Sequence, residues 1–313
     1  MNRYVLQRLL FLIPTILGVT LIIFLVMSLT PSTPGRTMLG PSATQADVDQ
    51  LNHELGYDQP ILKRYVDYVV DMVVNQDFGT SYYTKQSVFT EIWPRYIVTI
   101  KLATIGIILS TLIGVPLGIL AAVKQYSALD SIPSLLAFFI AAVPGFVLGM
   151  VLMFIFCLKL KLLPTYDNGT IAALIMPAIT IAIPPAAQNF RFTKSSMLEE
   201  IRQDYIRTAR AKGATERMVI WKHALQNALL PVVTNIGMNL GVLIAGAVVA
   251  EKLFSIQGIG SLIVDRISYK DEPTIIAGTI LIAIVFTVVM LLVDIAYAYI
   301  DPRIKAKYER LKG

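Results

Sequence analysis

The chain has 313 residues, of which 55% are hydrophobic and 15% are charged, and its mean hydropathy is +0.65. A charge content this low does not suit the surface of a soluble globular domain and is typical of a polytopic membrane protein. The formal net charge of +6 suits loops that face anionic lipid headgroups, and no feature of the sequence indicates nucleic-acid binding.

Six apolar runs approach the length of a membrane-spanning helix, which needs about 20 largely apolar residues. Five of them are clear, at residues 9–27, 97–123, 132–158, 231–250 and 275–300. The remaining run, residues 170–188, is shorter and contains Pro177, Pro184 and Pro185. This run is expected to be either a kinked span or a re-entrant segment. The sequence therefore predicts an all-α, polytopic integral membrane protein with six transmembrane helices.

The distribution of Lys and Arg favours six spans over five. With six spans, most basic residues gather on one side of the membrane: Arg3, Arg8, Lys124, Arg191, Lys194, Arg202, Arg207, Arg210, Lys212, Arg217, Lys222, Arg303, Lys305, Lys307, Arg310 and Lys312. Because basic residues are enriched on the cytoplasmic side, both termini are predicted to be cytoplasmic. The first run is too long for a typical signal-peptide core and is expected to be a retained anchor.

The sequence predicts three parts. Residues 1–29 form an N-terminal cytoplasmic end and a first span, residues 30–95 an extracytoplasmic segment, and residues 96–313 a core transmembrane domain. The extracytoplasmic segment is expected to open as an irregular loop rich in Pro and Gly. Thr44 is then predicted to cap a helix, and apolar residues at helical spacing predict another helix over residues 61–73.

The most informative stretch is a polar, helix-forming segment at residues 204–231, which lies between two apolar runs. A helix is expected to continue from the fourth span to Lys212, where Gly213 supplies a left-handed cap because glycine has no Cβ to clash. Thr215 is predicted to cap a second short helix. The apolar face of that helix comprises Met218, Val219 and Trp221. Two helices that meet at a glycine form a compact knob that another protein can approach closely.

This segment resembles the cytoplasmic loop by which the membrane subunits of binding-protein-dependent ABC importers dock on their ATPase subunits. The family pattern has a Glu-Ala-Ala triplet, three residues, a glycine, nine residues and Ile-x-Leu-Pro. Aligned on Gly213, the chain matches it only at Ala209, Gly213 and Leu225. However, Arg-Thr-Ala-Arg-Ala-Lys-Gly at 207–213 and His-Ala-Leu-x-Asn-Ala-Leu-x-Pro at 223–231 are similar to the forms of the dipeptide and oligopeptide permeases.

Other stretches resemble the same permeases and follow in order along nearly the whole chain. They include Leu-Gly-Tyr-Asp-Gln-Pro at 55–60, Asp-Phe-Gly-Thr-Ser-Tyr at 77–82, Gly-Ile-Gly at 258–260 and Asp-Pro-Arg-Ile at 301–304. The agreement of several separated stretches is far more specific than any one motif.

The resemblance implies the architecture of a type I ABC importer permease, which forms half of a substrate pathway in a prokaryotic cell membrane. It implies a second, homologous permease subunit, two ATPase subunits that bind ATP and Mg, and an extracytoplasmic binding protein. The implied solute is a dipeptide or oligopeptide, with nickel, glutathione or another small solute as alternatives. The implied ATPase-coupling loop covers about residues 189–226, and its candidate contact residues are Arg207, Thr208, Ala209, Arg210, Ala211, Lys212, Gly213, Ala214, His223 and Leu225.

The chain itself offers little chemistry. It carries no Gly-x-x-x-x-Gly-Lys-Ser/Thr loop, so ATP is expected to be hydrolysed by partner subunits. No catalytic residue, cofactor or metal site is predicted in the chain. Its one cysteine, Cys157, lies in an apolar run and is expected to be a small core residue.

Polar and small residues inside the apolar runs carry two further expectations. Asn235 and Asn239 lie four residues apart on one face of the fifth span, and carboxamides are costly to bury in lipid. They are expected either to line the translocation path or to form an interhelical hydrogen bond. Glycines four residues apart predict close helix packing at three pairs: Gly114 and Gly118, Gly145 and Gly149, and Gly237 and Gly241.

Two other functions agree less well with the sequence. An ion-coupled secondary transporter needs ionisable groups buried in its spans, and the spans offer only Lys101 and Asp294, each near an end. A membrane scaffold without transport activity would explain the hydropathy but not a glycine-hinged loop beside an amide-bearing span. The sequence therefore favours the importer permease.

Overall fold

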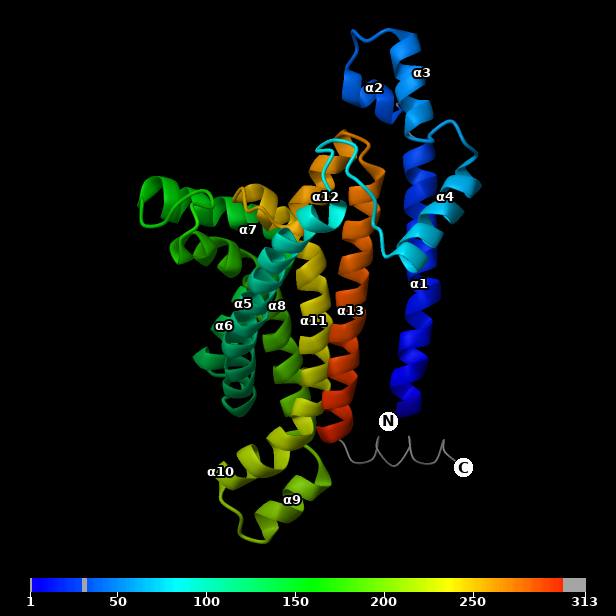
Figure 1. Ribbon diagram of the computed structural model, residues 1–313. Helices are drawn as coiled ribbons and strands as arrows, with labels where there is room; N and C mark the ends of the chain where they lie inside the picture. Colours follow the sequence, from blue (N-terminus) through cyan, green and yellow to red (C-terminus); the bar gives the residue numbers. More distant parts are fainter. Residues whose placement is uncertain (1, 30–32, 301–313) are drawn as a thin grey trace. The chain divides into compact units, whose positions relative to one another are not determined.

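The computed structural model describes residues 2–29 and 33–300, and its regular elements are helices (Figure 1). The α-helices are α1 (Asn2–Leu29), α2 (Pro34–Leu39), α3 (Gln45–Glu54), α4 (Ile61–Val70), α5 (Val88–Val123), α6 (Ala128–Ala142), α7 (Gly145–Leu152), α8 (Ile171–Ile201), α9 (Asp204–Ala211), α10 (Glu216–Met218), α11 (Leu225–Leu253), α12 (Ile259–Ser268) and α13 (Glu272–Ile300). Some are extended by π-helical turns: η1 (Asp71–Asn75), η2 (Met153–Lys159) and η3 (Val219–Ala224). Within the described residues, strand pairing is limited to an isolated bridge between Thr80 and Ser87. The predicted all-α fold is confirmed.

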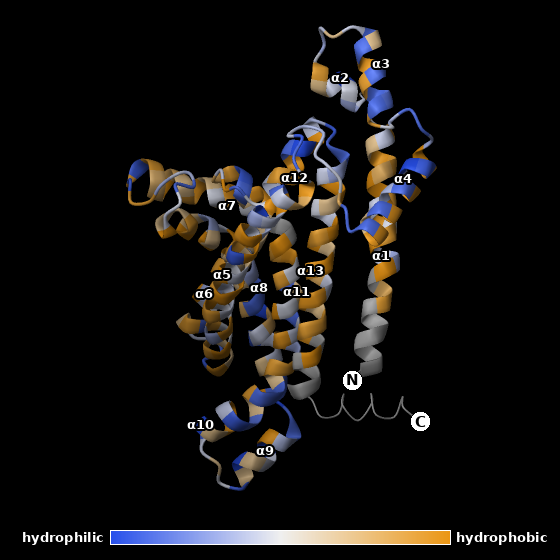
Figure 2. Ribbon diagram, viewed as in Figure 1, coloured by the Kyte–Doolittle hydropathy of each residue, from blue (hydrophilic) through white to orange (hydrophobic). Residues whose placement is uncertain are grey.

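All six predicted apolar runs coincide with helices. Within the described residues, four helical stretches are long and apolar enough to cross a membrane, namely Val88–Val123, Ile171–Ile201, Glu216–Ile244 and Glu272–Val293. The pair Ala128–Ala142 and Gly145–Lys159 passes the same test only when it is taken as one bent span. The first run contributes a shorter apolar helix, Ile13–Leu29. These helices confirm a polytopic membrane protein (Figure 2).

A proline breaks the third apolar run, where no break was predicted. The third run is divided between α6 and the helix formed by α7 and η2, and the two parts are bent by 106°. Val143 at the break is extended, with φ −100° and ψ 128°, and Pro144 follows it. Proline disfavours helical conformation in the residue before it, which explains why α6 ends there.

The fourth run, by contrast, is neither re-entrant nor broken. It forms one continuous helix, α8, that includes Pro177, Pro184 and Pro185 and extends to Ile201. Helices in membranes tolerate proline where neighbouring elements surround the freed backbone groups. Here Pro177 and Pro185 are buried in the packed helices.

The N-terminal soluble segment differs from its prediction at one place. Residues 34–39 form the short helix α2 and not an irregular loop. The Thr33 hydroxyl caps α2 by accepting from Arg36 N, and Pro34 occupies the first turn, where no backbone N–H is needed. The predicted cap of α3 is confirmed, because Thr44 Oγ1 accepts from Asp47 N at 3.2 Å.

The chain forms two compact units. Unit 1 comprises Met1–Thr99 and Gln257–Thr287, and unit 2 comprises Ile100–Ile256 and Val288–Gly313. The parts predicted from the sequence place residues 257–287 in the core transmembrane domain, whereas the contacts in the structure group them with the N-terminal residues. Those three sequence-derived parts stay a prediction.

Unit 1 is held together by buried ion pairs. Arg266 pairs with Glu91 and also lies 3.5 Å from Asp271. Asp271 accepts from Tyr82 N at 2.9 Å and from the Ser81 hydroxyl at 2.5 Å, which attaches the loop before α5 to the start of α13. Arg64 of α4 pairs with Glu272, whose side chain is 2% exposed. Each charge in these pairs therefore has an opposite charge beside it, as burial requires.

Unit 2 depends on close contact between α5 and α8. A Cβ on Gly114 would lie 2.5 Å from Ala186 O, and one on Gly118 would lie 2.7 Å from Phe190 O. Both glycines of this predicted pair are therefore packing positions. Gly149 also has a close neighbour, Thr180, whereas a Cβ on Gly145 would make only an ordinary contact at 3.7 Å.

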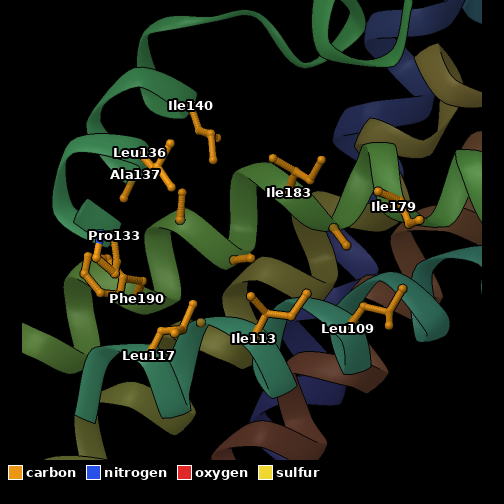
Figure 3. Close-up of a pocket in the computed structure, with 14 residues that line it drawn as sticks. Leu109, Ile113, Leu117, Pro133, Leu136, Ala137, Ile140, Ile179, Ile183 and Phe190 are labelled. Atoms are coloured by element: carbon orange, nitrogen blue, oxygen red, sulfur yellow. The ribbon is translucent and has the colours of Figure 1, made fainter. Parts of the chain in front are cut away.

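An apolar cavity of about 650 Å³ lies between α5, α6 and α8 in unit 2 (Figure 3). Its lining contains Leu109, Ile113, Leu117, Leu136, Ile179, Ile183 and Phe190. One side of α8 is thus covered with hydrocarbon side chains.

We predict that Gly114→Val destabilises unit 2 by about 1–3 kcal/mol, because the new side chain must displace the α8 backbone. Thermal unfolding of the purified protein in detergent measures the effect. Gly145→Ala is the matched control and should leave the melting temperature nearly unchanged. Equal melting temperatures for Gly114→Val and the wild type would contradict the packing.

Candidate functional site: a glycine-hinged loop and an asparagine cluster

The loop at residues 202–224 joins α8 to α11 through two helices. The single helix predicted from the fourth span to Lys212 is interrupted, because α8 ends at Ile201 and α9 begins at Asp204. The predicted left-handed conformation of Gly213 is confirmed, since its φ is +81°. The predicted cap of the second helix is also confirmed, because Thr215 Oγ1 accepts from Met218 N at 3.4 Å.

The loop packs on the helices of unit 2 through one side only. Buried residues from α9 and η3 join the ends of the spans in a single apolar cluster: Ile119, Ala122, Met197, Ile206, Val219, Ala224 and Ala228. The predicted apolar face of the second helix is therefore divided. Val219 is buried, whereas Met218 and Trp221 are 46% and 55% exposed.

The candidate contact residues lie mainly on the open side of this loop. Those that are exposed are Arg207, Thr208, Arg210, Ala211, Lys212 and Gly213, and those that are half-buried are Ala209, Ala214, His223 and Leu225. Apart from its two chain neighbours, no described residue has a heavy atom within 4 Å of where a Cβ on Gly213 would stand. The surface around the hinge is consequently free for another protein.

Polar contacts within the chain brace the hinge. The Arg210 guanidinium donates to both carboxylate oxygens of Glu216, at 2.7 and 3.2 Å, and so joins α9 to α10 across Gly213. This bond raises the pKa of Arg210 further. Tyr205 donates to Glu200 at 2.5 Å and accepts from Asn227, which links α9 to the ends of α8 and α11. Burial, followed by the bond to Glu200, raises the pKa of Tyr205, so its hydroxyl remains a donor at neutral pH.

The two asparagines singled out in the fifth span meet a third on α8. Asn235 and Asn239 are buried, and their side-chain amides donate to Asn189 Oδ1 at 2.9 and 3.0 Å. Gln188 donates to Asn235 Oδ1 at 3.3 Å. Of the two roles expected for this pair, these contacts correspond to the interhelical hydrogen bond. Its partner Asn189 was missed because the apolar run on α8 stops at residue 188.

Within the described residues, no group of three or more His, Cys, Asp or Glu side chains is placed to hold a metal ion. Cys157 is buried in η2, where burial suits a small apolar residue. The Asp294 side chain lies outside the described residues.

We predict that Asn189→Leu lowers the stability of the α8–α11 pair by several kcal/mol, because two buried amides lose their acceptor at about 1–3 kcal/mol each. The loss of stability is measured by unfolding the purified protein in detergent and recording the fluorescence of a probe that does not react with thiols. The triple variant with leucine at 189, 235 and 239 should recover much of it, since apolar groups of similar size replace all three partners. A single variant as stable as the wild type would contradict this role.

Two protein families match most of the chain. The family described as "Binding-protein-dependent transport system inner membrane component" matches residues 114–306. The N-terminal family of the same membrane components matches residues 1–103.

Several relatives align along nearly the full chain. The dipeptide transport system permease protein DppB of Alkalihalophilus pseudofirmus is 38% identical, over 97% of this chain and 100% of that protein. The glutathione transport system permease protein GsiC is 39% identical in Salmonella choleraesuis and 36% identical in Escherichia coli K12, in each case over 98% of this chain and 100% of the relative.

Solved structures share the fold. A chain of the MetNI methionine ABC transporter, in an inward-facing conformation, superposes with a TM-score of 0.59 at 17% identity, over 68% of this chain and 97% of that one. A chain of an amino acid ABC transporter with histidines gives a TM-score of 0.52 at 16% identity, over 69% and 94%. The protein is a multi-pass membrane permease whose family implies ATPase and binding-protein partners, and it belongs to the inner membrane components of binding-protein-dependent transport systems.

Proposed function

We propose that this permease imports short peptides. The support is that full-length relatives at 36–39% identity carry a dipeptide or glutathione, and glutathione is itself a tripeptide. A peptide-sized solute with a free carboxylate is common to both. Glutathione import is the second candidate on the same observation.

In this proposal the chain is half of a pathway. A second, homologous permease subunit supplies the other half, and two ATPase subunits bind ATP and Mg and carry out the hydrolysis. An extracytoplasmic binding protein delivers the peptide. The chain contributes no catalytic group and acts as a conduit and a coupling lever.

The observation that carries the coupling role is the contrast between the two sides of the loop at residues 202–224. Its inner side is buried through Ile206 and Val219, while Met218, Trp221 and the turn at Gly213 are exposed. An exposed tryptophan beside basic side chains is a typical anchor for a protein partner. A partner that docks there would act on α5, α8 and α11 through the buried side.

We predict that Gly213→Val reduces peptide uptake and the recovery of ATPase subunits with the purified complex. A β-branched residue at φ +81° incurs left-handed strain of about 1–2 kcal/mol, and its side chain enters the open docking surface. Uptake of radiolabelled trialanine and glutathione is measured in cells with equal amounts of membrane-inserted permease. These two solutes also test the substrate class.

Gly169→Val is the matched control for this experiment. Gly169 has φ +76° and nothing within 4 Å of a Cβ, but it lies between η2 and α8, away from the loop. It should leave uptake and ATPase recovery near wild-type levels. Equal behaviour of the two variants would remove the coupling role, and failure of the wild type to take up either solute would remove the peptide assignment.

We also predict that both termini and the loop at residues 202–224 are cytoplasmic. In a Cys157→Ala background, Asp71→Cys in unit 1 should react with a membrane-impermeant maleimide added outside intact spheroplasts. Lys212→Cys should react only after the membrane is permeabilised. Both positions are exposed, so the difference reports the side of the membrane. The reverse pattern would refute this orientation.

A further inference from the structure

A stripe of exposed residues, four of them polar and one aromatic, runs along α8 on the side opposite to the apolar cavity. The cavity lining includes Ile179, Ile183 and Phe190 (Figure 3). At about 100° per residue, the opposite side of the helix carries Gln188, Arg191, Phe192, Ser195 and Glu199, and the hydrophilic colours on α8 are visible in Figure 2. We call these five residues the polar stripe. Each of them is exposed.

The polar stripe begins inside the span at Gln188 and continues to Glu199, near the end of α8. Gly118 of α5 contacts α8 at Phe190. The next charged residue after Gly118 is Lys124, which directly follows α5 and lies six residues, or about 9 Å along a helix, beyond Gly118. The helix α11 also packs on α8, where Asn235 donates to Asn189, two residues before Arg191. Arg191 therefore lies deeper in the membrane-spanning region than Lys124, the first charged residue after this part of α5.

The charges on the stripe have no partner among the residues that the structure describes. Within the described residues, neither Arg191 nor Glu199 makes a hydrogen bond or an ion pair. Lys194, on a different side of the same helix, is bonded to Asp130 and to the Ser134 hydroxyl. A cation at this depth that faced lipid without a partner would be costly, and such residues normally face a water-filled path.

An open cavity of about 450 Å³ lies over this stripe. Its lining consists of Gln188, Arg191, Phe192, Ser195, Ser196, Glu199 and Pro231. It therefore combines one cation, one carboxylate, two hydroxyls, an amide and an aromatic ring. Such a set suits a zwitterion with polar and apolar parts.

We propose that the polar stripe of α8 lines the translocation path and that Arg191 receives the carboxylate of the passing peptide, with Glu199 facing its ammonium group. The inference rests on the proposed peptide import. Eight residues of helix separate the two charges by about 12 Å, while a three-residue extended peptide spans about 10–11 Å. Guanidinium groups bind carboxylates through two parallel hydrogen bonds, which favours arginine at the carboxylate end.

The charge of the path is tested with a single reporter cysteine. Ser195→Cys, midway between the two charges, is made in a Cys157→Ala background, and the whole transporter is reconstituted in nanodiscs. Its modification rate is measured with anionic sulfonatoethyl and cationic trimethylammonioethyl methanethiosulfonate. Arg191→Gln should lower the anion-to-cation rate ratio about threefold or more, and Glu199→Gln should raise it.

Two controls accompany the rates. Ile183→Cys, on the cavity side of α8, should react with neither charged reagent. Arg191→Lys should keep the rate ratio of Ser195→Cys near that of the wild type. A ratio that does not respond to Arg191→Gln, or an unreactive Ser195→Cys, would overturn the proposal.

Protection identifies the carboxylate. Excess trialanine should slow modification of Ser195→Cys, trialanine amide should protect less, and Arg191→Gln should abolish the difference between them. Charge-sensitive modification without protection would mean that the stripe faces lipid headgroups, and the proposal would fall. Trialanine uptake by the wild type is measured separately. If the wild type takes up trialanine but modification of Ser195→Cys responds neither to charge nor to trialanine, only this inference is rejected. If the wild type takes up no trialanine, the proposed function itself is rejected.

Discussion

The orientation of α8 about its own axis is the constraint on which unit 2 depends. Carboxamides within a span must find partners inside the protein, because hydrocarbon offers none. Asn189 accepts from both Asn235 and Asn239, so one side of α8 is held against α11. With that side fixed, Ile183 turns to the apolar cavity and Ser195 to the polar one. A rotation by a single residue would expose amides to lipid and bury a charge.

Local features of the sequence were sufficient to predict much of this molecule. Hydropathy located the apolar runs, and the cap at Thr215 and the hinge at Gly213 follow from short-range backbone chemistry. The end of α8 was misplaced because residues 189–212 contain no proline or glycine that would mark the break between Ile201 and Asp204. A helix that borders a polar cavity keeps its hydrogen bonds while its exposed side becomes hydrophilic. Hydropathy also could not predict the break at Pro144, because the residues on both sides of it are apolar.

Other features arise from contacts between distant parts of the chain. Glu91 and Arg266 are 175 positions apart, and only folding reveals that they share a buried pair. The division between buried Val219 and exposed Trp221 likewise depends on where η3 meets the cluster around Met197. Periodicity over a segment as short as α10 and η3 identifies apolar residues but not the direction in which each one faces. The Arg210–Glu216 pair crosses a turn, so no helical spacing predicts it.

The brace across Gly213 also has a mechanical consequence. A loose connector would absorb a push from a partner by bending, whereas this loop has its turn closed by Arg210 and its inner side wedged between Ile119, Met197 and Ala228. Those three residues belong to α5, α8 and α11. A force applied at the loop therefore acts on three helix ends at once. Because the loop itself deforms little, most of its displacement is passed on to these helices.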